Sequence, residues 1–403
     1  MELPGVPSVL LVALRSAAAA AGVSRLALVG GVVRDQLLQQ RHGRAWSVVP
    51  DLDWVVEGDA AGLAQQLLLR CGADRVTGLQ HHDAFGTVAL ELDGIALDLA
   101  TARQESYSAP AENPTVRPGT LLQDLVRRDF TINAMALDLL SGDLIDPHAG
   151  QQDLAAGRLV FLHGSSVRDD PTRVIRAARY AARLGFDLAA ADQQQVLITV
   201  AAWPWAWTPN DPPAMAPPAL ASRLRMELDR LLEREPWQQA LNHLERWQAL
   251  ALLDAALQQD PQRSRRLRWA RRLGVPLLAA LLAVVPHPGA VAERLQIPGQ
   301  QQQWLMRLPS LHAWLQQQAP PVSASPAVWS DSLEAGGWMP ELVALMVCLQ
   351  PPQWKPLLRW WGRWRHLQSP QSARELLAQG WQPGPALGQE LRRLRRAALD
   401  QSR

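Results

Sequence analysis

The sequence contains little cysteine, almost no lysine and no long hydrophobic segment. Its two cysteines, Cys71 and Cys348, lie far apart and lack metal-ligand spacing, which indicates a reducing compartment. The longest apolar run after the N-terminus, residues 275–285, is too short to span a bilayer and contains Pro276. Residues 1–22 are apolar but lack a basic start, so they predict an amphipathic helix rather than a signal peptide. We therefore expect a cytoplasmic protein with no membrane contact.

The positive charge comes almost entirely from arginine. The net charge is only +2, and Lys355 is the single lysine among 403 residues. Arginine binds phosphate through two parallel hydrogen bonds and stacks on nucleobases, whereas lysine acts as a point charge. Codon bias explains the same preference equally well, so composition alone does not indicate a nucleic-acid-binding protein.

The first 140 residues alternate between strand and helix patterns. Strands are expected at 24–29, 51–56, 86–92 and 95–99, and a helix at 60–71. Asp93-Gly94 between alternating apolar residues predicts a hairpin in which Leu90 faces Leu97. Asp98 then lies on the opposite, polar face of its strand; alternatively it simply faces water.

A glycine turn precedes a pair of carboxylates. Gly30-Gly31 and Arg34 are followed by Asp51 and Asp53, which share one face of a strand. Such a pair suits two Mg²⁺ ions that act on both oxygens of a phosphoryl transfer. The turn exposes backbone N–H groups to phosphates, and Arg34 could add a bidentate contact. Alone, an Asp-x-Asp is more simply a strand end that reaches solvent.

Two further segments carry arginine beside carboxylate or amide groups. In the first, Arg128 could neutralise phosphate, and Asp129 and Asn133, one helical turn apart, could bind ribose hydroxyls. The alternative is that Asp129 caps a helix and pairs with Arg128. In the second, Asp170 precedes Pro171 as an N-cap.

Three positions follow Asp170 on or near one face of the helix that it begins: Arg173, Arg176 and Arg179. An aspartate and an arginine fixed on a helix can read the Watson–Crick edge of a base. The further arginines would contact phosphates. The alternative is a capped helix with a solvated basic face.

The rest of the chain is expected to be helical, with few strand signals beyond residue 150. Residues 104–120 predict a mobile loop, and 203–218 and 320–326 predict breaks between helices. Three basic clusters could contact RNA, with tryptophans available for stacking; solvated helix faces are the alternative. They comprise Arg263, Arg265, Arg266, Arg268, Arg271 and Arg272 with Trp269; Arg359, Arg363 and Arg365 with Trp360, Trp361 and Trp364; and Arg392, Arg393, Arg395 and Arg396.

In this order the motifs resemble those of class II tRNA nucleotidyltransferases and bacterial poly(A) polymerases, in the polymerase-β nucleotidyltransferase superfamily. The resemblance covers residues 24–235, with a short tail match at 383–388. It implies an α+β fold: an N-terminal head with a small mixed sheet, followed by an all-α neck, body and tail. The implied domains are a catalytic head at 1–140, a neck at 141–235, and a tRNA-binding body and tail at 236–403.

The resemblance also implies a role for each motif. Asp51 and Asp53 would hold Mg²⁺, with Asp98 as a further catalytic carboxylate. The implied nucleotide-binding residues are Gly30, Gly31 and Arg34 for the triphosphate; Arg128, Asp129 and Asn133 for the ribose; Asp170 and Arg173 for the base; and Arg176 and Arg179 in support. Glu227 and Asp229 would brace the neck.

The implied reaction adds C, A or both to the 3′ end of tRNA from CTP and ATP. Residues 104–120 lack the charged pairs of loops that switch the family's pocket from C to A, which leaves addition of CC alone as an option. Asp169 replaces the family's usual Glu. A poly(A) polymerase shares the head, and an inactive RNA-binding protein is the alternative of another class. The motifs carry no information on oligomeric state.

Overall fold

The structure, a computed structural model, describes residues 6–42, 52–82 and 86–402. It divides into two compact units. The N-terminal unit comprises Met1–Thr208, Pro217–Ala219 and Arg234–Ala249; the C-terminal unit comprises Pro209–Ala216, Leu220–Glu233 and Leu250–Arg403. The division into head, neck, and body with tail stays a prediction.

A seven-stranded mixed sheet organises the N-terminal unit, which confirms the predicted fold class. Its order is β3-β4-β5-β2-β1-β8-β9, and β2 and β5 run parallel while the other neighbours run antiparallel. The strands are β1 (Arg25–Val29), β2 (Leu52–Glu57), β3 (Val76–His82), β4 (Thr87–Leu92), β5 (Ile95–Thr101), β8 (Ala136–Asp138) and β9 (Leu144–Ile145).

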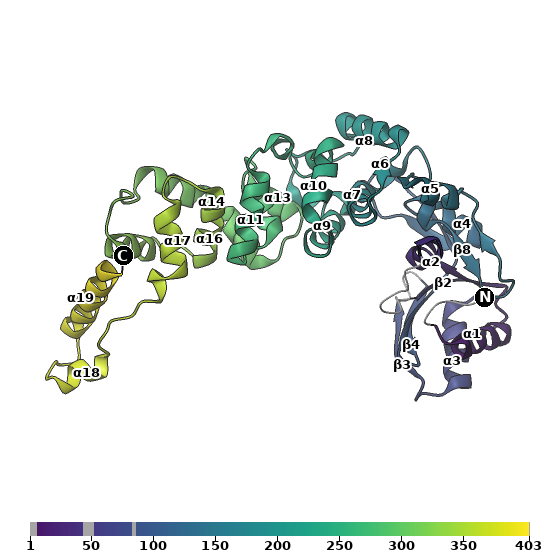
Figure 1. Ribbon diagram of the computed structural model, residues 1–403, viewed down its shortest axis with the longest axis horizontal. Helices are drawn as coiled ribbons and strands as arrows, with labels where there is room; N and C mark the ends of the chain where they lie inside the picture. The colour runs from purple at the N-terminus through teal and green to yellow at the C-terminus, as the bar shows by residue number, and fades with distance from the viewer. Residues whose placement is uncertain (1–5, 43–51, 83–85, 403) are drawn as a thin grey trace. The chain divides into compact units, whose positions relative to one another are not determined.

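Two helices, α1 (Ser8–Ala20) and α3 (Ala60–Cys71), lie side by side against the sheet (Figure 1). Helix α3 has the predicted bounds. Asp59 caps it by accepting a hydrogen bond from the backbone N–H of Ala61, as a short polar side chain before an apolar helix does. The leucines of α3 at positions 63 and 67 are fully buried, so its apolar stripe joins the core.

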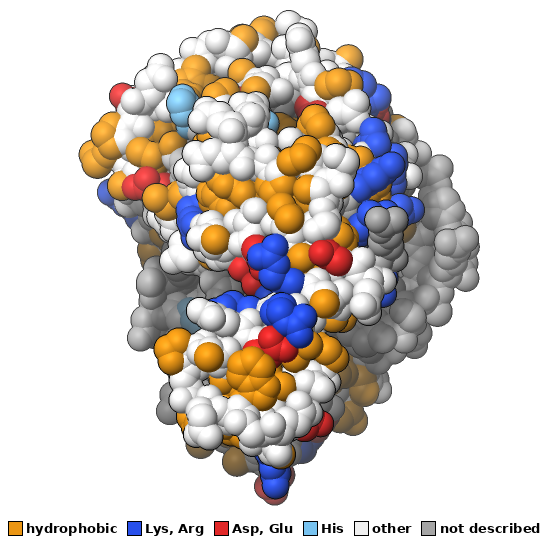
Figure 2. Space-filling view, turned by 90° about the vertical axis from the view of Figure 1, so that its left-hand side faces the viewer, with side chains coloured by type: hydrophobic (Ala, Val, Ile, Leu, Met, Phe, Trp, Pro, Cys, Tyr) orange, Lys and Arg blue, Asp and Glu red, His pale blue; other side chains and the backbone are white. Residues whose placement is uncertain are grey.

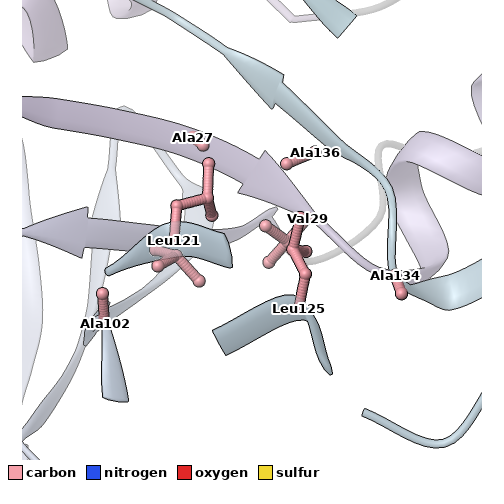
Figure 3. Close-up of a cluster of buried hydrophobic side chains, with 8 residues drawn as sticks. Ala27, Val29, Ala102, Leu121, Leu125, Ala134 and Ala136 are labelled. Atoms are coloured by element: carbon pink, nitrogen blue, oxygen red, sulfur yellow. The ribbon is translucent and has the colours of Figure 1, made fainter. Parts of the chain in front are cut away.

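A second apolar cluster fixes helix α4 (Leu121–Val126) over β1 and β2. Leu121 and Leu125 point from α4 toward Ala27 and Val29 of β1 (Figure 3). Val55 of β2 belongs to the same cluster. Because strand residues two apart share a face, Asp53 lies on the same face of the sheet as this cluster, where its side chain stays exposed. The cluster therefore sets the position of the arginines that directly follow α4.

The hairpin of β4 and β5 has the predicted register, with Leu90 opposite Leu97 and Asp98 opposite Ala89. Asp93 and Gly94 both have positive φ, 54° and 76°, as the expected two-residue turn requires. The expectation of a loop at 104–120 is wrong in part. The strands β6 (Arg103–Ser106) and β7 (Thr115–Pro118) pair antiparallel there.

The N-terminal unit continues in short elements and helices. These are η2 (Thr131–Asn133), α5 (Gly150–Ala156), β10 (Arg158–Leu159), α6 (Ser166–Asp169), α7 (Thr172–Leu184), β11 (Asp187–Leu188), α8 (Ala190–Ala202) and α10 (Trp237–Arg246). Helix α2 (Gly31–His42) directly follows β1. Most of the predicted nucleotide-binding residues lie in three places: the start of α2, the N-terminus of α7 and the segment after α4.

The C-terminal unit is helical, as predicted. Its α-helices are α9 (Ser222–Arg234), α11 (Arg263–Leu273), α12 (Leu277–Leu282), α13 (Pro288–Arg294), α14 (Gly299–Gln317), α15 (Pro326–Ala335), α16 (Pro340–Leu349), α17 (Trp354–Gly362), α18 (Ala373–Ala378) and α19 (Pro385–Gln401). Helix α16 is central, with residues 342–348 all buried. No single helix of the described residues is long and apolar enough to cross a membrane; α15 and α16 pass such a test only together, with a 117° bend between them.

Candidate functional site

The turn between β1 and α2 brings together three predicted site residues. Gly30 has φ of 74°, a conformation that favours glycine. A Cβ atom there would lie 3.3 Å from Nη1 of Arg128 and 3.9 Å from Oδ2 of Asp53. Gly30, Asp53 and Arg128 therefore converge, and a side chain at position 30 would crowd the group.

Two carboxylates lie on neighbouring parallel strands beside this turn. Asp53 of β2 is the register partner of Asp98 of β5, so both point to the same face of the sheet. Asp53 is exposed and Asp98 half-buried. Asp51 lies outside the described residues. Among those that are described, no group of three or more His, Cys, Asp and Glu side chains is close enough to hold a metal ion.

Arg128 is oriented by a buried carboxylate that sequence reasoning missed. Its Nη2 lies 2.9 Å from Oδ2 of Asp124, and Nη2 of Arg127 lies 2.6 Å from Oδ1 of the same side chain. Asp124 is fully buried. Burial alone would raise the pKa of Asp124, but the two guanidinium groups lower it below its usual range. The spacing of four residues from Asp124 to Arg128 was the available signal.

Arg34 lies inside the unit, with 2% of its surface exposed. Its Nε donates to Asp35 at 2.7 Å, and its Nη1 donates to Oδ1 of Asn133, also at 2.7 Å. Its guanidinium lies over the ring of Tyr180, 5.1 Å from the ring centre. Burial opposes its charge, but Asp35 and Tyr180 keep the pKa of Arg34 above its ordinary value. These contacts connect α2 to α7; the triphosphate contact of Arg34 stays a prediction.

Asp129 and Asn133 do meet, but not on a helix. The backbone of Phe130 is extended, and only Thr131–Asn133 forms a 3-10 turn. Nδ2 of Asn133 donates to Oδ1 of Asp129 at 3.0 Å, while Nη2 of Arg176 lies 2.7 Å from the other carboxylate oxygen. Burial would raise the pKa of Asp129, but Arg176 and the Asn133 hydrogen bond hold it below its usual range. Asp129 thus pairs with Arg176, not Arg128.

Helix α7 begins as predicted. Oδ1 of Asp170 accepts from the backbone N–H of Thr172 at 3.0 Å and from its hydroxyl at 2.6 Å. Arg173 is 3% exposed and donates to the carbonyl of Arg127 at 2.9 Å. A solvated basic face is therefore the wrong description of this helix.

The far end of α7 is fixed by a buried carboxylate from just before α10. Nη2 of Arg179 lies 3.4 Å from Oε1 of Glu235, and Arg183 pairs with the same carboxylate. Glu235 lies 56 residues beyond Arg179 along the chain, so no local pattern could have identified it. Tyr180, which also lies near Arg183, was missed for the same reason, because its contact with Arg34 joins α7 to the distant α2.

The first basic cluster of the C-terminal unit is smaller on the surface than predicted. Arg263 and Arg266 are buried, and Nε of Arg266 donates to the carbonyl of Ala280 at 2.6 Å. Four arginines of α11 remain exposed: Arg265, Arg268, Arg271 and Arg272. Beside them, Trp269 packs against Trp354 with ring centres 5.8 Å apart.

The third cluster is largely neutralised by carboxylates. Arg393 lies 2.7 Å from Glu390, Arg395 2.6 Å from Glu334, and Arg396 2.8 Å from Asp331. Figure 2 views the molecule from the side of α18 and α19 and shows basic side chains next to acidic ones amid apolar surface. Charge pairing thus distinguishes the third cluster from the first.

Comparisons with known proteins show what this chain is similar to. The model of the poly A polymerase head domain matches residues 26–160. A CC-adding tRNA nucleotidyltransferase of Deinococcus radiodurans is 34% identical over 388 residues, 94% of this chain and 85% of the relative. An A-adding tRNA nucleotidyltransferase of Aquifex aeolicus is 43% identical over 167 residues.

The Aquifex match covers 41% of this chain and only 19% of the relative; a second A-adding relative, from Halalkalibacterium halodurans, is 40% identical over 40% of this chain and 36% of its own length. Among solved structures, a CCA-adding enzyme in an apo form has a TM-score of 0.73 at 24% identity, covering 98% of this chain and 92% of that one. A tRNA-processing enzyme with CTP has a TM-score of 0.64 at 25% identity, covering 96% and 100%.

Residues 26–160 match the poly A polymerase head domain, and the fold as a whole is that of a CCA-adding enzyme. The full-length relative goes further: the chain belongs to the tRNA nucleotidyltransferase family. The predicted resemblance is confirmed, and the relatives favour this family over the poly(A) polymerases. Enzymes of this family generally use divalent metal ions.

Proposed function

We propose that this protein transfers CMP, AMP or both from CTP or ATP to the 3′-hydroxyl of a tRNA and releases pyrophosphate. The observation that carries the proposal is the convergence of Gly30, Asp53 and Arg128, with Asp98 as the register partner of Asp53. It combines a carboxylate pair with a backbone turn and a guanidinium, the groups that a metal-bound triphosphate needs.

In this proposal Asp51 and Asp53 hold Mg²⁺, and Asp98 assists them. Carboxylate oxygens are the ligands that this hard cation prefers, and the exposed Asp53 has the donor chemistry for it. The metal would supply positive charge at the phosphates of the bound nucleotide. The chain's own contribution is to hold the nucleotide in place, through Gly31 and Arg34 at the triphosphate with Arg128 beside them, because fixed geometry removes much of the entropic barrier.

The nucleoside would lie against the buried arginine network. Asp129 and Asn133 are proposed to bind the ribose, with Arg34 and Arg176 holding them. Asp170 and Arg173 are proposed to read the base from the start of α7. Arg179 fixes that helix through Glu235.

The full-length relative favours addition of CC. The Deinococcus protein, which carries that name, matches 94% of this chain, whereas the two A-adding relatives match about 40% of it. We propose that the enzyme acts in the cytoplasm. The structures named as complexes with tRNA and with CTP belong to proteins of the same fold, and we extend both ligands to this chain by analogy.

Three tRNA substrates test the proposal, ending before the first C, before the second C and before the A. Each is incubated with one labelled nucleoside triphosphate and Mg²⁺, and the product length is read on a gel. Extension by C on the first two substrates alone indicates a CC-adding enzyme. A long A tail would identify a poly(A) polymerase, and no incorporation on any substrate would leave an inactive RNA-binding protein.

A further inference from the structure

We infer that His163 is a positioning residue for Arg173: a neutral imidazole that accepts a hydrogen bond and holds the guanidinium in the orientation that selects the base. The inference rests on the proposed function, because it takes Arg173 as a residue that reads the incoming nucleotide. It assigns a specificity role to a side chain outside the motifs found in the sequence.

The contact permits only one arrangement of protons. Nη1 of Arg173 lies 3.2 Å from Nε2 of His163, while its Nη2 donates to the carbonyl of Arg127 at 2.9 Å. A guanidinium has donors and no acceptor. Nε2 must therefore offer its lone pair, which requires a neutral ring with its proton on Nδ1. Two acceptors from different segments thus define the plane of the Arg173 guanidinium.

The position of His163 is itself fixed from another helix. Gln195 of α8 donates from Nε2 to the carbonyl of His163 at 3.3 Å and accepts at Oε1 from the N–H of Val167 at 3.2 Å. The N–H of Ser166 also donates to the His163 carbonyl, at 3.1 Å. The backbone of His163 is thus held by α8 and the start of α6, not by α7, so this residue can restrain Arg173 independently of the helix that carries the arginine.

Two charged groups face the imidazole: Arg173 from α7 and Asp169 from α6. Burial and the neighbouring Arg173 lower the pKa of His163, while Asp169 opposes them. The acceptor form therefore predominates at neutral pH. A second proton would convert Nε2 into a donor and set two positive groups against each other. Arg173 would then lose one of its two restraints as the pH falls.

The test compares nucleotide discrimination in three proteins. The readout is the ratio of kcat/KM for CTP to that for UTP, measured from about pH 8 to about pH 5.5. A ratio cancels pH effects shared by both nucleotides. In the wild type it should fall as the pH is lowered. His163→Leu, which has no acceptor, should lower the ratio roughly tenfold at neutral pH, as loss of one hydrogen bond to a charged group does.

The conservative variant isolates the acceptor. In His163→Gln the amide oxygen can replace Nε2 but does not titrate, so the ratio should stay near the wild-type value and become independent of pH. His243→Gln is the matched control, because His243 also contacts an arginine, Arg246, at 2.9 Å, yet lies outside the candidate site. It should leave both the ratio and its pH profile unchanged.

A measurement without turnover covers the case in which His163→Leu does not fold. The ¹⁵N chemical shifts of His163 in the wild type should show a protonated Nδ1 and an unprotonated Nε2 at neutral pH. A protonated Nε2 would overturn the inference, as would an unchanged ratio in His163→Leu or equal loss in the Leu and Gln variants. Arg173→Ala tests the role of Arg173 separately from that of His163. If this variant also leaves the ratio unchanged, the proposal that Arg173 reads the base fails as well.

Discussion

Arg34 and Arg294, one buried arginine from each unit, make different kinds of contact. In the N-terminal unit, Arg34 bonds to Asn133 and lies over Tyr180, so it connects segments that carry predicted site residues. In the C-terminal unit, Arg294 donates to the carbonyls of Leu252 and Leu253 at 3.0 and 2.7 Å. The first arrangement orients side chains, whereas the second satisfies backbone groups at the end of a 3-10 turn.

The difference shows that burial alone does not identify a functional arginine. A guanidinium that donates to backbone carbonyls stabilises the fold through those bonds wherever it occurs. One that contacts side chains from several segments also sets their geometry. Loss of Arg34 in the N-terminal unit should therefore lower both activity and stability. Loss of Arg294 in the C-terminal unit should lower stability alone.

The largest effect is expected at the exposed carboxylate of the N-terminal unit. Asp53→Asn should lower incorporation about a thousandfold, roughly 4 kcal/mol of transition-state stabilisation, because a charged metal ligand is removed. The melting temperature should change little, since Asp53 is exposed. Glu91→Gln, an exposed carboxylate on β4, is the control. Near-normal turnover of Asp53→Asn with Mg²⁺ would remove the catalytic assignment; we expect Asp51→Asn to behave in the same way.

Arg34→Met should affect both stability and activity. Arg34 donates to the buried Asn133 and to the half-exposed Asp35, so its removal should cost about 2 kcal/mol of unfolding free energy, because these acceptors lose their donor. Urea unfolding should report that loss. Incorporation should fall even under conditions where the variant is folded, since Asn133 is no longer held. A folded variant with unchanged kcat and KM would show that the network has no part in the site.

Arg294→Met provides the other half of the comparison. Two backbone carbonyls would lose their donor, for a loss of about 2 kcal/mol in the free energy of unfolding. The CTP-to-UTP ratio should stay at the wild-type value. A change in that ratio without a change in stability would contradict the contrast between the two units.

A smaller effect is expected in acid. Asp129 has a pKa below its ordinary value of 3.8 in the folded protein, so its contribution to stability is present above that value and is lost as the pH falls through the folded pKa. In Arg176→Ala, burial still raises the pKa of Asp129, but the largest of the opposing interactions is gone and only the weaker ones, from Asn133, Arg173 and the N–H of Phe130, remain. Urea unfolding between about pH 5 and pH 2 should show that the variant loses this contribution at a higher pH than the wild type does. Within that range its free energy of unfolding should be lower by about 1 kcal/mol. Identical profiles would contradict the ion pair.

The smallest effect is expected on the salt dependence of tRNA binding, in which two basic clusters of the C-terminal unit should differ. Arg268 is exposed on α11, whereas Arg393 pairs with Glu390. If tRNA binds the α11 arginines, Arg268→Ala should reduce the salt dependence of binding by about one counterion. Arg393→Ala, the matched control, should have less effect because Glu390 already compensates its charge. Filter binding at several salt concentrations measures both, and equal slopes would argue against the α11 surface.

The sequence by itself determined features that depend on neighbours along the chain. The Asp93-Gly94 hairpin and its register, the bounds of α3 and the cap that Asp170 provides for α7 all follow from local backbone preference and apolar period. The same local pattern put Asp98 on the face of its strand opposite to Leu97 and Leu99, whereas its place beside Asp53 depends on the pairing of β2 with β5.

Only the tertiary structure decided which arginines are buried and what they contact. Arg34 meets a partner 99 residues away, and Arg266 of the first basic cluster turns inward to the carbonyl of Ala280. The sequence likewise did not predict the hairpin of β6 and β7, because its residues follow no regular pattern. There Glu105 of β6 contacts Arg127, which follows the hairpin in the chain. The sequence shows which side chains are basic. Which carboxylate or carbonyl each of them contacts depends on segments that are distant in sequence.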